Sequence, residues 1–548
     1  MKFQIKRFSK LLFLFASVCI LFFASCNQTG KISENDIVIL YTNDVHCSID
    51  ENIGYVGLVE YKTMIQQKTP FVTLVDAGDA IQGSSIGSLS KGESIIEIMN
   101  EAGYDVAVPG NHEFDYGWER FFQLSEELNC GYVSCNFRQK LSDEAYQQLF
   151  FEPYKIIEYN NKKVAFVGIC TPETFFKSSS TNFEDKNGER LCYFDGENDE
   201  KELYSSVQNA INSARSEGAD FVILVAHIGE NRVTEKWNAM NVVKNTFGAD
   251  ILIDGHSHET TPSMKVQNSS GKNVIITQTG TKFKNIGQLT IKQNGKISAK
   301  LINSVPKAKS NLPKNPDVIK MQNLIASIRE NFNKILSQKI GETDFDLVAI
   351  DSFGRWLVRN NETNLSDLVS DAYRIVCKTD IGIINAGGLR NNIKKGEITY
   401  GDVLSVHPFE NKIFVFEISG KTLKDELEFG VKKYPNSSGG FLQVSGLSFK
   451  IDSHLPSPVQ DDRSFVGEYR VHDIFVNGEE LDLDKNYTVA TTDFVVLDNG
   501  DGHSFSDAKV VCEKGIDCDV GCEYIKMLGG KIPESYKNEN GQGRIKIK

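Results

Sequence analysis

An apolar run of strand length that ends in a polar cluster occurs five times between residues 37 and 258 of this chain. Unbroken apolar runs are typical of strands buried on both faces, and layered α/β folds gather their ligand sites at the carboxyl ends of such strands. We therefore expect the five clusters to meet at one edge. The segments are IVILYTNDVH at 37–46, FVTLVDAGD at 71–79, VAVPGNHEFD at 106–115, FVILVAHIG at 221–229 and ILIDGHSH at 251–258.

The remaining pattern predicts two domains. Helical stretches lie between some of the runs, at 57–67, 93–101 and 202–217, as an α/β layer requires. A polar, proline-containing stretch at 307–316 is typical of a linker, and 317–338 has the spacing of an amphipathic helix. A second set of apolar runs begins near residue 347. We predict domains at 34–305 and 345–548, joined by a helical linker over 306–344.

The composition excludes several classes of protein. With 13 Pro and 44 Gly in 548 residues, and 40% hydrophobic residues, the chain is neither collagen-like nor disordered. A net charge of −13 argues against a nucleic-acid polymer as partner, because phosphate contact needs a positive face. An anionic substrate would therefore need local positive charge, supplied by metal ions or by a few placed arginines.

The N-terminus has the pattern of a targeting segment. Residues 2–10 are basic, 11–23 are apolar but short for a membrane span, and Ala24-Ser25-Cys26 follows. This resembles a bacterial lipoprotein signal over 1–25, with Cys26 as the lipid-bearing residue. The alternative is an ordinary secretory signal with an incidental Cys. We expect a protein of the bacterial cell envelope that is anchored to the membrane by lipid.

Nine further cysteines follow Cys26. An exported chain can form disulfides, and the best local candidates are Cys130 with Cys135 and the cluster Cys512, Cys518 and Cys522. The odd number leaves at least one thiol unpaired, and the residues do not fix a connectivity. No CxxC pair occurs, so a zinc ribbon is not supported.

The polar clusters predict a site for two divalent cations. Carboxylate, imidazole and amide oxygen suit Zn, Mn, Co or similar ions, which would lower the pKa of a bound water and offset phosphoryl charge. Asp79 is the natural bridging ligand. Single motifs such as DxH are weak, but five in this order are hard to explain as packing. The candidate ligands are Asp44, His46, Asp79, Asn111, His227, His256 and His258.

These clusters resemble the calcineurin-like metallophosphoesterase pattern of Asp-x-His, Gly-Asp, Gly-Asn-His-Glu, His and Gly-His-x-His. With the second domain, they resemble the bacterial 5′-nucleotidase family, which includes UDP-sugar hydrolases. The resemblance implies an α/β fold with a four-layer α/β/β/α metal domain and an α+β substrate-binding domain. It implies one metal on Asp44, His46, Asp79 and His258 and a second on Asp79, Asn111, His227 and His256. Some relatives carry Gln in place of His258.

His112 follows the ligand Asn111 and is not itself an expected ligand. By resemblance it contacts the phosphate and stabilises the transition state. Asp115, three residues on, would orient the ring and favour the imidazolium. The alternative role for Asp115 is to cap the helix predicted after it. Both roles are compatible, and we expect a catalytic dyad.

The second domain carries candidates for a nucleotide pocket. Arg355 and Arg359 are four residues apart and would share one face of a helix, and Arg390 follows two glycines. Any single arginine is more often a surface ion pair, and any single Phe more often a core residue. By resemblance, the three arginines would hold a carboxylate-like or phosphate group. The other implied contacts are Phe409 and Phe494 around the base, Asn411 and Asp501 on base or ribose, and Gly439 in the lining.

Phe505 and Phe441 compete with Phe494, because the step from Phe494 to Asp501 is one residue longer than in the family. The function that we predict is a 5′-nucleotidase that releases phosphate from nucleoside 5′-monophosphates, with UDP-sugars as a second substrate, acting as monomer or dimer. One alternative is a 2′,3′-cyclic nucleotide phosphodiesterase with 3′-nucleotidase activity, whose members tend to carry Asn in place of Asp115. Another is a non-catalytic nucleotide-binding lipoprotein.

Overall fold

We describe the fold from a computed structural model, which covers residues 32–140, 148–178, 180–185, 189–230, 236–305, 315–409 and 411–548. The predicted signal at 1–25 and Cys26 lie outside the described residues. Across the covered ranges, no helix has both the length and the apolar character needed to cross a membrane.

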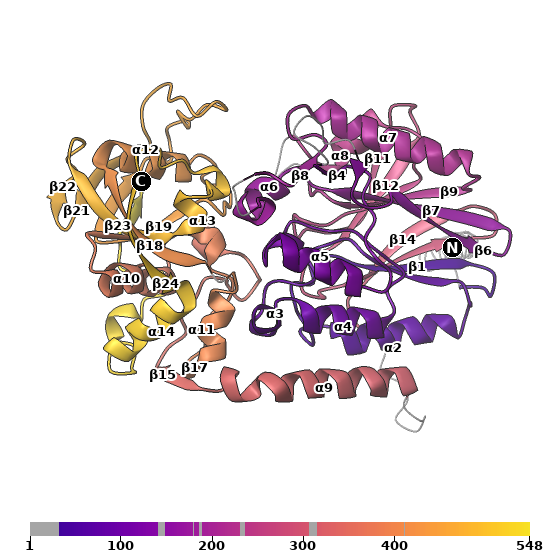
Figure 1. The fold of residues 1–548 in the computed structure, drawn as a ribbon, viewed down its shortest axis with the longest axis horizontal. Helices are drawn as coiled ribbons and strands as arrows, with labels where there is room; N and C mark the ends of the chain where they lie inside the picture. The colour runs from indigo at the N-terminus through magenta and orange to yellow at the C-terminus, as the bar shows by residue number, and fades with distance from the viewer. Residues whose placement is uncertain are drawn as a thin grey trace, which may run out of the picture.

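The first half of the chain forms two stacked sheets (Figure 1). One has the order β14 (Ile297–Ile302), β13 (Ile286–Ile291), β1 (Ile37–Thr42), β2 (Val72–Asp76), β3 (Val106–Ala107). The other has the order β11 (Thr260–Gln267), β12 (Asn273–Thr279), β10 (Ile251–Ile253), β9 (Phe221–His227), β7 (Lys162–Cys170), β6 (Tyr154–Tyr159). The strands that precede the polar clusters are parallel within each sheet, so their carboxyl ends share an edge.

Both faces of each sheet are covered, which explains the unbroken apolar runs. In β1, Ile37, Ile39 and Tyr41 pack between the sheets, whereas Val38 and Leu40 pack under the helices. The helices on this side are α2 (Gly54–Gln66), α4 (Glu93–Ala102) and α5 (Trp118–Glu127), and those on the far side are α7 (Glu200–Ser216) and α8 (Ala239–Asn245). The four-layer α/β/β/α arrangement predicted from the family resemblance is confirmed.

The predicted linker helix is α9 (Pro316–Leu336). It begins where the side chain of Asn315 accepts a hydrogen bond from the Asp317 N–H, with Pro316 in the first turn. Its apolar stripe, including Met321 and Ile325, is buried with α2 and α4 in the core of the first domain. Figure 1 shows α9 running along that domain towards the second one.

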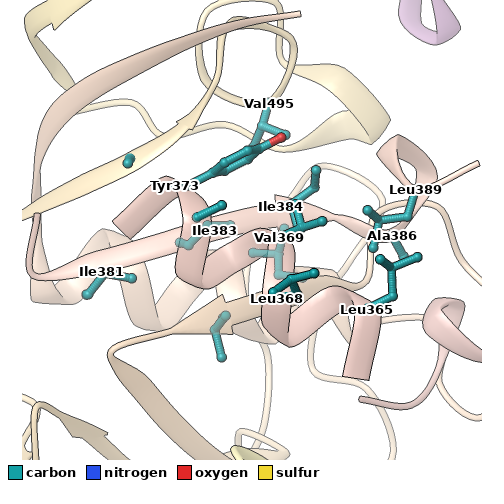
Figure 2. Packing of buried hydrophobic residues seen from close by; sticks show 14 of the residues in the cluster. Leu365, Leu368, Val369, Tyr373, Ile381, Ile383, Ile384, Ala386, Leu389 and Val495 are labelled. Atoms are coloured by element: carbon teal, nitrogen blue, oxygen red, sulfur yellow. The ribbon is translucent and has the colours of Figure 1, made fainter. Parts of the chain in front are cut away.

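The second domain is built on a five-stranded mixed sheet with the order β19 (Leu442–Ser445), β16 (Ile381–Asn385), β23 (Asn486–Thr492), β18 (Lys412–Ser419), β24 (Lys509–Ile516). Helix α10 (Asn364–Cys377) lies on it. Val369 and Tyr373 pack near Ile383 of β16, whereas Leu365 packs near Ala386 (Figure 2). A capping box between Thr363 and Ser366 fixes where α10 begins.

Smaller elements complete this domain. A second sheet has the order β22 (Glu479–Glu480), β21 (Val471–Val476), β20 (Leu447–Ile451), β25 (Ile545–Ile547), and β15 (Lys339–Thr343) pairs with β17 (Gly396–Thr399). The helices besides α10 are α11 (Tyr400–Val406), α12 (Gly420–Gly430), α13 (Asp493–Val496) and α14 (Asp517–Met527). This domain has the mixed strand and helix content expected of an α+β fold.

Candidate metal centre and nucleotide pocket

The predicted ligands converge at the carboxyl ends of five strands. Their Asp and His side chains form two groups, Asp44, His46, Asp79 and His258, and Asp79, His227 and His256, and within each group the candidate ligand atoms lie within 4.8 Å of one another. Asp79 belongs to both groups. Asn111 joins the second group, because its Oδ1 lies 2.9 Å from Nδ1 of His256.

Hydrogen bonds on the far side of the rings aim their lone pairs into the site. Nδ1 of His46 donates to the Gln82 carbonyl (3.1 Å), and Nδ1 of His227 donates to the Ala77 carbonyl (2.7 Å). Since a carbonyl can only accept, Nε2 carries the lone pair in the neutral form of each ring. These are the outer partners that orient metal-binding imidazoles.

The inward-facing atoms crowd into the space that a cation would occupy. The Nε2 atoms of His46 and His258 are 2.9 Å apart. Nε2 of His227 is buried with no hydrogen-bond partner among the described residues and stands 3.1 Å from Oδ2 of Asp79. Several acceptors facing one another in a buried site are the arrangement that a divalent ion satisfies. The residues present therefore fit the divalent metals that the sequence predicts.

The electrostatics agree with this conclusion. Burial lowers the pKa of His46 well below its usual range, and the neighbouring His258 lowers it further, so the ring stays in the neutral, ligating form. Burial also acts to lower the pKa of His227, but Asp79 more than offsets it and the pKa rises to about 10. That rise reflects the negative potential with which the two aspartates attract a cation.

The loops that present the ligands have an uncommon backbone conformation. Asp44, His46, Asp79, His256 and His258 all have φ between 48° and 76°, the left-handed region that non-glycine residues rarely occupy. Such strain persists only where the surroundings enforce it.

Glu113 supplies much of the constraint on these loops. Its buried carboxylate accepts from the N–H groups of Asp79 (2.9 Å), Ala80 (2.7 Å) and Gly110 (2.6 Å), which joins the β2 and β3 loops. Burial and the charge of Asp79 raise the pKa of Glu113 to about 7. No role was predicted from sequence for Glu113, although it stands inside the GNHEFD motif.

Helix α6 (Thr174–Lys177) and its N-cap residue Glu173 supply two more contacts that were not predicted from sequence. Oε2 of Glu173 accepts from Nε2 of His256 at 3.0 Å, which leaves Nδ1 of that ring facing Asn111. One turn later, Nζ of Lys177 forms an ion pair with Oδ1 of Asp501 in the second domain at 3.1 Å. No motif marks either residue, because α6 is distant in sequence from both of its contacts.

The predicted dyad is formed in the structure. Nδ1 of His112 donates to Oδ2 of Asp115 at 2.6 Å, and Oδ1 of Asp115 accepts from the Ser178 hydroxyl at 2.8 Å. Burial opposes the charged form of His112, but Asp115 and Asp79 outweigh it and raise the pKa of the ring. The backbone N–H of His112 donates to Oδ1 of Asp79 at 2.9 Å. Asp115 makes no side-chain cap to α5, whose N-cap is Gly117.

Two of the three predicted arginines lie together next to the metal centre. The guanidinium of Arg359 is 4.5 Å from the Trp356 ring and that of Arg390 is 5.4 Å from it. Arg390 is also 5.5 Å from the ring of Phe409, which in turn lies 5.7 Å from the ring of His112. Burial and Arg390 lower the pKa of Arg359 to about 10. Nε of Arg359 is buried without a hydrogen-bond partner in the described part of the chain, as a vacant anion contact would be.

Arg355 does not join this pair, and the predicted shared helix is wrong. Oδ1 of Asp351 accepts from the N–H groups of Phe353 and Arg355, which closes a turn there, and only Leu357–Arg359 is helical, as η3. The side chain of Arg355 is 75% exposed and pairs with Asp351 at 2.6 Å.

Asp501 and Gly439, both predicted for the nucleotide pocket, lie together in the second domain. Oδ2 of Asp501 accepts from Nδ2 of Asn385 at 2.8 Å, and a Cβ added at Gly439 would lie 3.1 Å from either carboxylate oxygen of Asp501. Burial opposes ionisation of Asp501, but Lys177 and Asn385 hold its pKa at about 2. Oδ1 of Asn385 is buried with no partner among the described residues, so it is available to a ligand.

The other residues predicted for the nucleotide pocket are Phe494, its two competitors and Asn411. Phe494, on α13, is half-buried and packs against Gly500, whereas its competitors Phe441 and Phe505 are buried in the core. Asn411 is half-buried at the start of β18, and its backbone carbonyl accepts from the Asp517 N–H.

The nine described cysteines are all free thiols, so neither disulfide candidate is formed.

Contacts between the two domains bring the predicted nucleotide-binding residues close to the metal centre. Pro408, one residue before Phe409, has a carbonyl that accepts from the Ser88 hydroxyl at 2.8 Å and from Nε2 of Gln82 at 3.5 Å. Ser88 lies on α3 (Ser85–Ser90), just after the Asp79 loop. With the Lys177–Asp501 pair, these bonds hold the two domains so that Phe409 lies between Arg390 and His112. Figure 1 shows α6 of the first domain next to the second domain.

Two stacked sheets whose strand ends gather these Asp and His side chains define a metal-dependent phosphoesterase. The particular family follows from two matched regions: residues 37–260 match the calcineurin-like phosphoesterase family, and residues 339–508 match the 5′-nucleotidase C-terminal domain. The chain belongs to the 5′-nucleotidase family and, like its members, is an enzyme.

Known proteins resemble the chain along most of its length. It is 27% identical over 556 residues to the trifunctional nucleotide phosphoesterase protein YfkN of Bacillus subtilis, covering 93% of this chain but 35% of that protein. It is 25% identical over 504 residues to the 5′-nucleotidase of Vibrio parahaemolyticus, covering 85% of this chain and 84% of the relative. The 5′-nucleotidase precursor of Thermus thermophilus shares the fold with a TM-score of 0.76 at 24% identity, over 93% of this chain and 99% of that one.

Proposed function

We propose that this chain hydrolyses nucleoside 5′-monophosphates to nucleoside and phosphate, with UDP-sugars as a second substrate class. The observation that carries the proposal is the position of Arg390 and Phe409 against His112, because it puts an anion-binding pair and an aromatic ring beside the metal ligands. The relatives named 5′-nucleotidase support the substrate class. The relative named a trifunctional nucleotide phosphoesterase supports more than one nucleotide substrate.

The chain's own residues divide the work between its domains. Asp44, His46, Asp79 and His258 would hold one divalent ion, and Asp79, Asn111, His227 and His256 the other. Bound there, such ions supply Lewis-acid activation of water and charge compensation for phosphoryl oxygens.

His112 and the second domain would handle the substrate. The protonated ring of His112, held by Asp115, donates from Nε2 to the phosphoryl group as charge develops on it. Arg359 and Arg390 would bind the anionic part of the substrate, and Phe409 would stack on the base.

A substrate panel tests the proposal. Phosphate release from AMP, 3′-AMP, 2′,3′-cyclic AMP and UDP-glucose is measured on the full chain loaded with Mn²⁺, Co²⁺ or Zn²⁺. We expect AMP to have the largest kcat/KM, with measurable UDP-glucose cleavage. Preference for 3′-AMP and the cyclic nucleotide would instead identify a cyclic phosphodiesterase. No release from any substrate, combined with nucleotide binding, would identify a binding protein.

Replacing Arg359 with alanine is expected to raise the KM for AMP roughly ten- to a hundredfold, because charged hydrogen bonds of about 1.5–3 kcal/mol are lost. The rate constant kcat should change much less, since the metal ligands are untouched. Arg355→Ala is the matched control: its exposed ion pair with Asp351 predicts a KM within about twofold of the unmodified chain. Equal effects of the two substitutions would show that Arg355 also reaches the substrate.

We also propose that Cys26 is lipidated and anchors the enzyme in the bacterial cell envelope, as the basic, apolar and small-residue pattern of 1–26 predicts. Metabolic labelling with a radioactive fatty acid should mark the expressed chain, and Cys26→Ser should remove the label. Equal labelling of both chains would exclude Cys26 as the anchor, and no labelling of either would indicate an ordinary secretory signal.

A further inference from the structure

Two cysteines that the proposed reaction does not use lie one turn apart on α14. Cys518 and Cys522 are 2% and 4% exposed, and their thiols are hydrogen-bonded to each other. The Tyr400 hydroxyl, at the start of α11, also contacts the thiol of Cys518. In the described ranges this pair is the reduced, free-thiol form.

Closing this pair into a disulfide requires the first turn of α14 to tighten. Residues four apart on an α-helix have Cα atoms about 6 Å apart. Disulfides span Cα separations of roughly 4.4–6.8 Å but Cβ separations of only roughly 3.5–4.5 Å, whereas Cβ atoms four residues apart on a helix are about 5–6 Å apart, so the bond can close only if this turn moves. Cys518 is the second residue of α14, where the helix can tighten at its end without disturbing several turns.

A cavity gives small reagents access to the pair. A hollow of about 430 Å³ is lined by Cys522, Tyr400, Gln338 and Ile340, together with acidic and basic residues of α14. It lies where the chain leaving α9 enters the second domain. The hydrogen bond with Cys518 lowers the pKa of Cys522 against burial and the charge of Asp519, and Lys526 adds a smaller lowering effect. Cys522 combines a lowered pKa with a place in the lining of this hollow, which is where a reagent would approach it.

The same turn of α14 holds the nucleotide-stacking segment in place. Asp517, immediately before Cys518, donates its N–H to the Asn411 carbonyl at 2.9 Å, and its carboxylate lies 3.8 Å from Nδ1 of His407. Asp517 therefore contacts residues on both sides of Phe409. Any shift of this turn moves the segment that carries the Phe409 ring and the interdomain Pro408 carbonyl.

We propose that Cys518 and Cys522 form a reversible disulfide that weakens nucleotide binding by displacing this segment. In the step, the thiolate of one cysteine attacks an external disulfide, and the other cysteine then displaces the mixed disulfide. One S–S bond forms in the protein, one breaks in the reagent, and the reagent leaves as two thiols carrying the two protons. The effect on binding rests on the proposed nucleotidase function, whereas formation of the bond does not.

The test compares the full chain, loaded with Mn²⁺, after treatment with dithiothreitol or with oxidised glutathione. Trypsin cleaves after Lys514 and Lys526, so both thiols fall in one peptide that holds no other cysteine. After oxidation, we expect this peptide to be lighter by two hydrogen atoms. The KM for AMP should rise roughly three- to tenfold with a smaller change in kcat, and dithiothreitol should reverse both changes.

Variants separate this pair from the other thiols. Cys522→Ser should abolish both the mass change and the KM response, while Cys512→Ser, on the neighbouring strand β24, should keep both. An oxidised peptide with an unchanged KM, no oxidation of the peptide, or a response that survives Cys522→Ser would each overturn the proposal. If the reduced enzyme releases no phosphate from AMP, the proposed function fails, and the peptide mass still reports on the disulfide.

Discussion

Replacing His112 with alanine is expected to lower kcat for AMP by roughly 10²–10⁴-fold while the metal content stays that of the unmodified chain. His112 belongs to neither group of metal ligands, and its Nδ1 donates a hydrogen bond to Asp115 at 2.6 Å. Its contribution is therefore a proton and a positive charge placed beside the phosphoryl group. Steady-state kinetics with elemental analysis of the same preparations measure both parts of the expectation.

A matched substitution isolates the role of the dyad. Asp115→Asn keeps a hydrogen-bond acceptor for the ring but removes the charge that favours the imidazolium, so its loss in kcat should be smaller than that of His112→Ala. Thermal unfolding checks that both variants are folded. Loss of metal in parallel with activity in His112→Ala would make this residue a ligand and would contradict the dyad.

The convergence of the metal ligands was predictable from sequence because one rule places them all. Parallel strands buried on both faces bring their carboxyl ends to a common edge, and Asp44, Asp79 and His256 each follow such a strand. The division into two groups came from the family resemblance rather than from spacing. The structure places the same side chains together.

The contacts that orient a metal ligand or join the two domains were not predictable from sequence, because they link segments with no common periodicity. Glu173 reaches His256 across 83 residues, and Lys177 reaches Asp501 across 324. The four-residue spacing of Arg355 and Arg359 alone predicted that the two share one face of a helix. Asp351 instead closes a turn by accepting from the N–H groups of Phe353 and Arg355. A local side-chain acceptor therefore decided the backbone conformation, and the four-residue spacing did not.

The cysteines also show that nearness along the chain does not predict which side chains meet. Sequence proximity nominated Cys130 with Cys135, yet Cys135 is buried in the core beneath the second sheet while Cys130 packs under the helices of the first. Proximity along the chain gave no information about which face of a layer each residue occupies. For Cys518 and Cys522 the helix fixes the face, so the spacing is informative.

Asp79→Asn is expected to remove both metal sites together and to lower kcat by at least roughly a hundredfold, since even outer contacts of a metal centre are worth ten- to a hundredfold. Asp79 is shared by the two ligand groups, so losing its charge weakens each of them. Asparagine keeps an oxygen for the His112 N–H, which protects the loop from collapse. Elemental analysis should show two ions in the unmodified chain and a fraction of one in the variant.

A ligand that serves one group makes the sharpest comparison. His258 belongs to the first group alone, so His258→Ala should retain the ion held by Asp79, Asn111, His227 and His256. Because bound ions stabilise the folded state, a chelator should lower the Tm of the unmodified chain and of His258→Ala but leave Asp79→Asn unchanged. Asp50→Asn, on the surface beside Arg329, controls for loss of a carboxylate and should behave as the unmodified chain does. If Asp79→Asn kept two ions, each group would have to hold its ion without a shared carboxylate, and the bridged arrangement would be wrong.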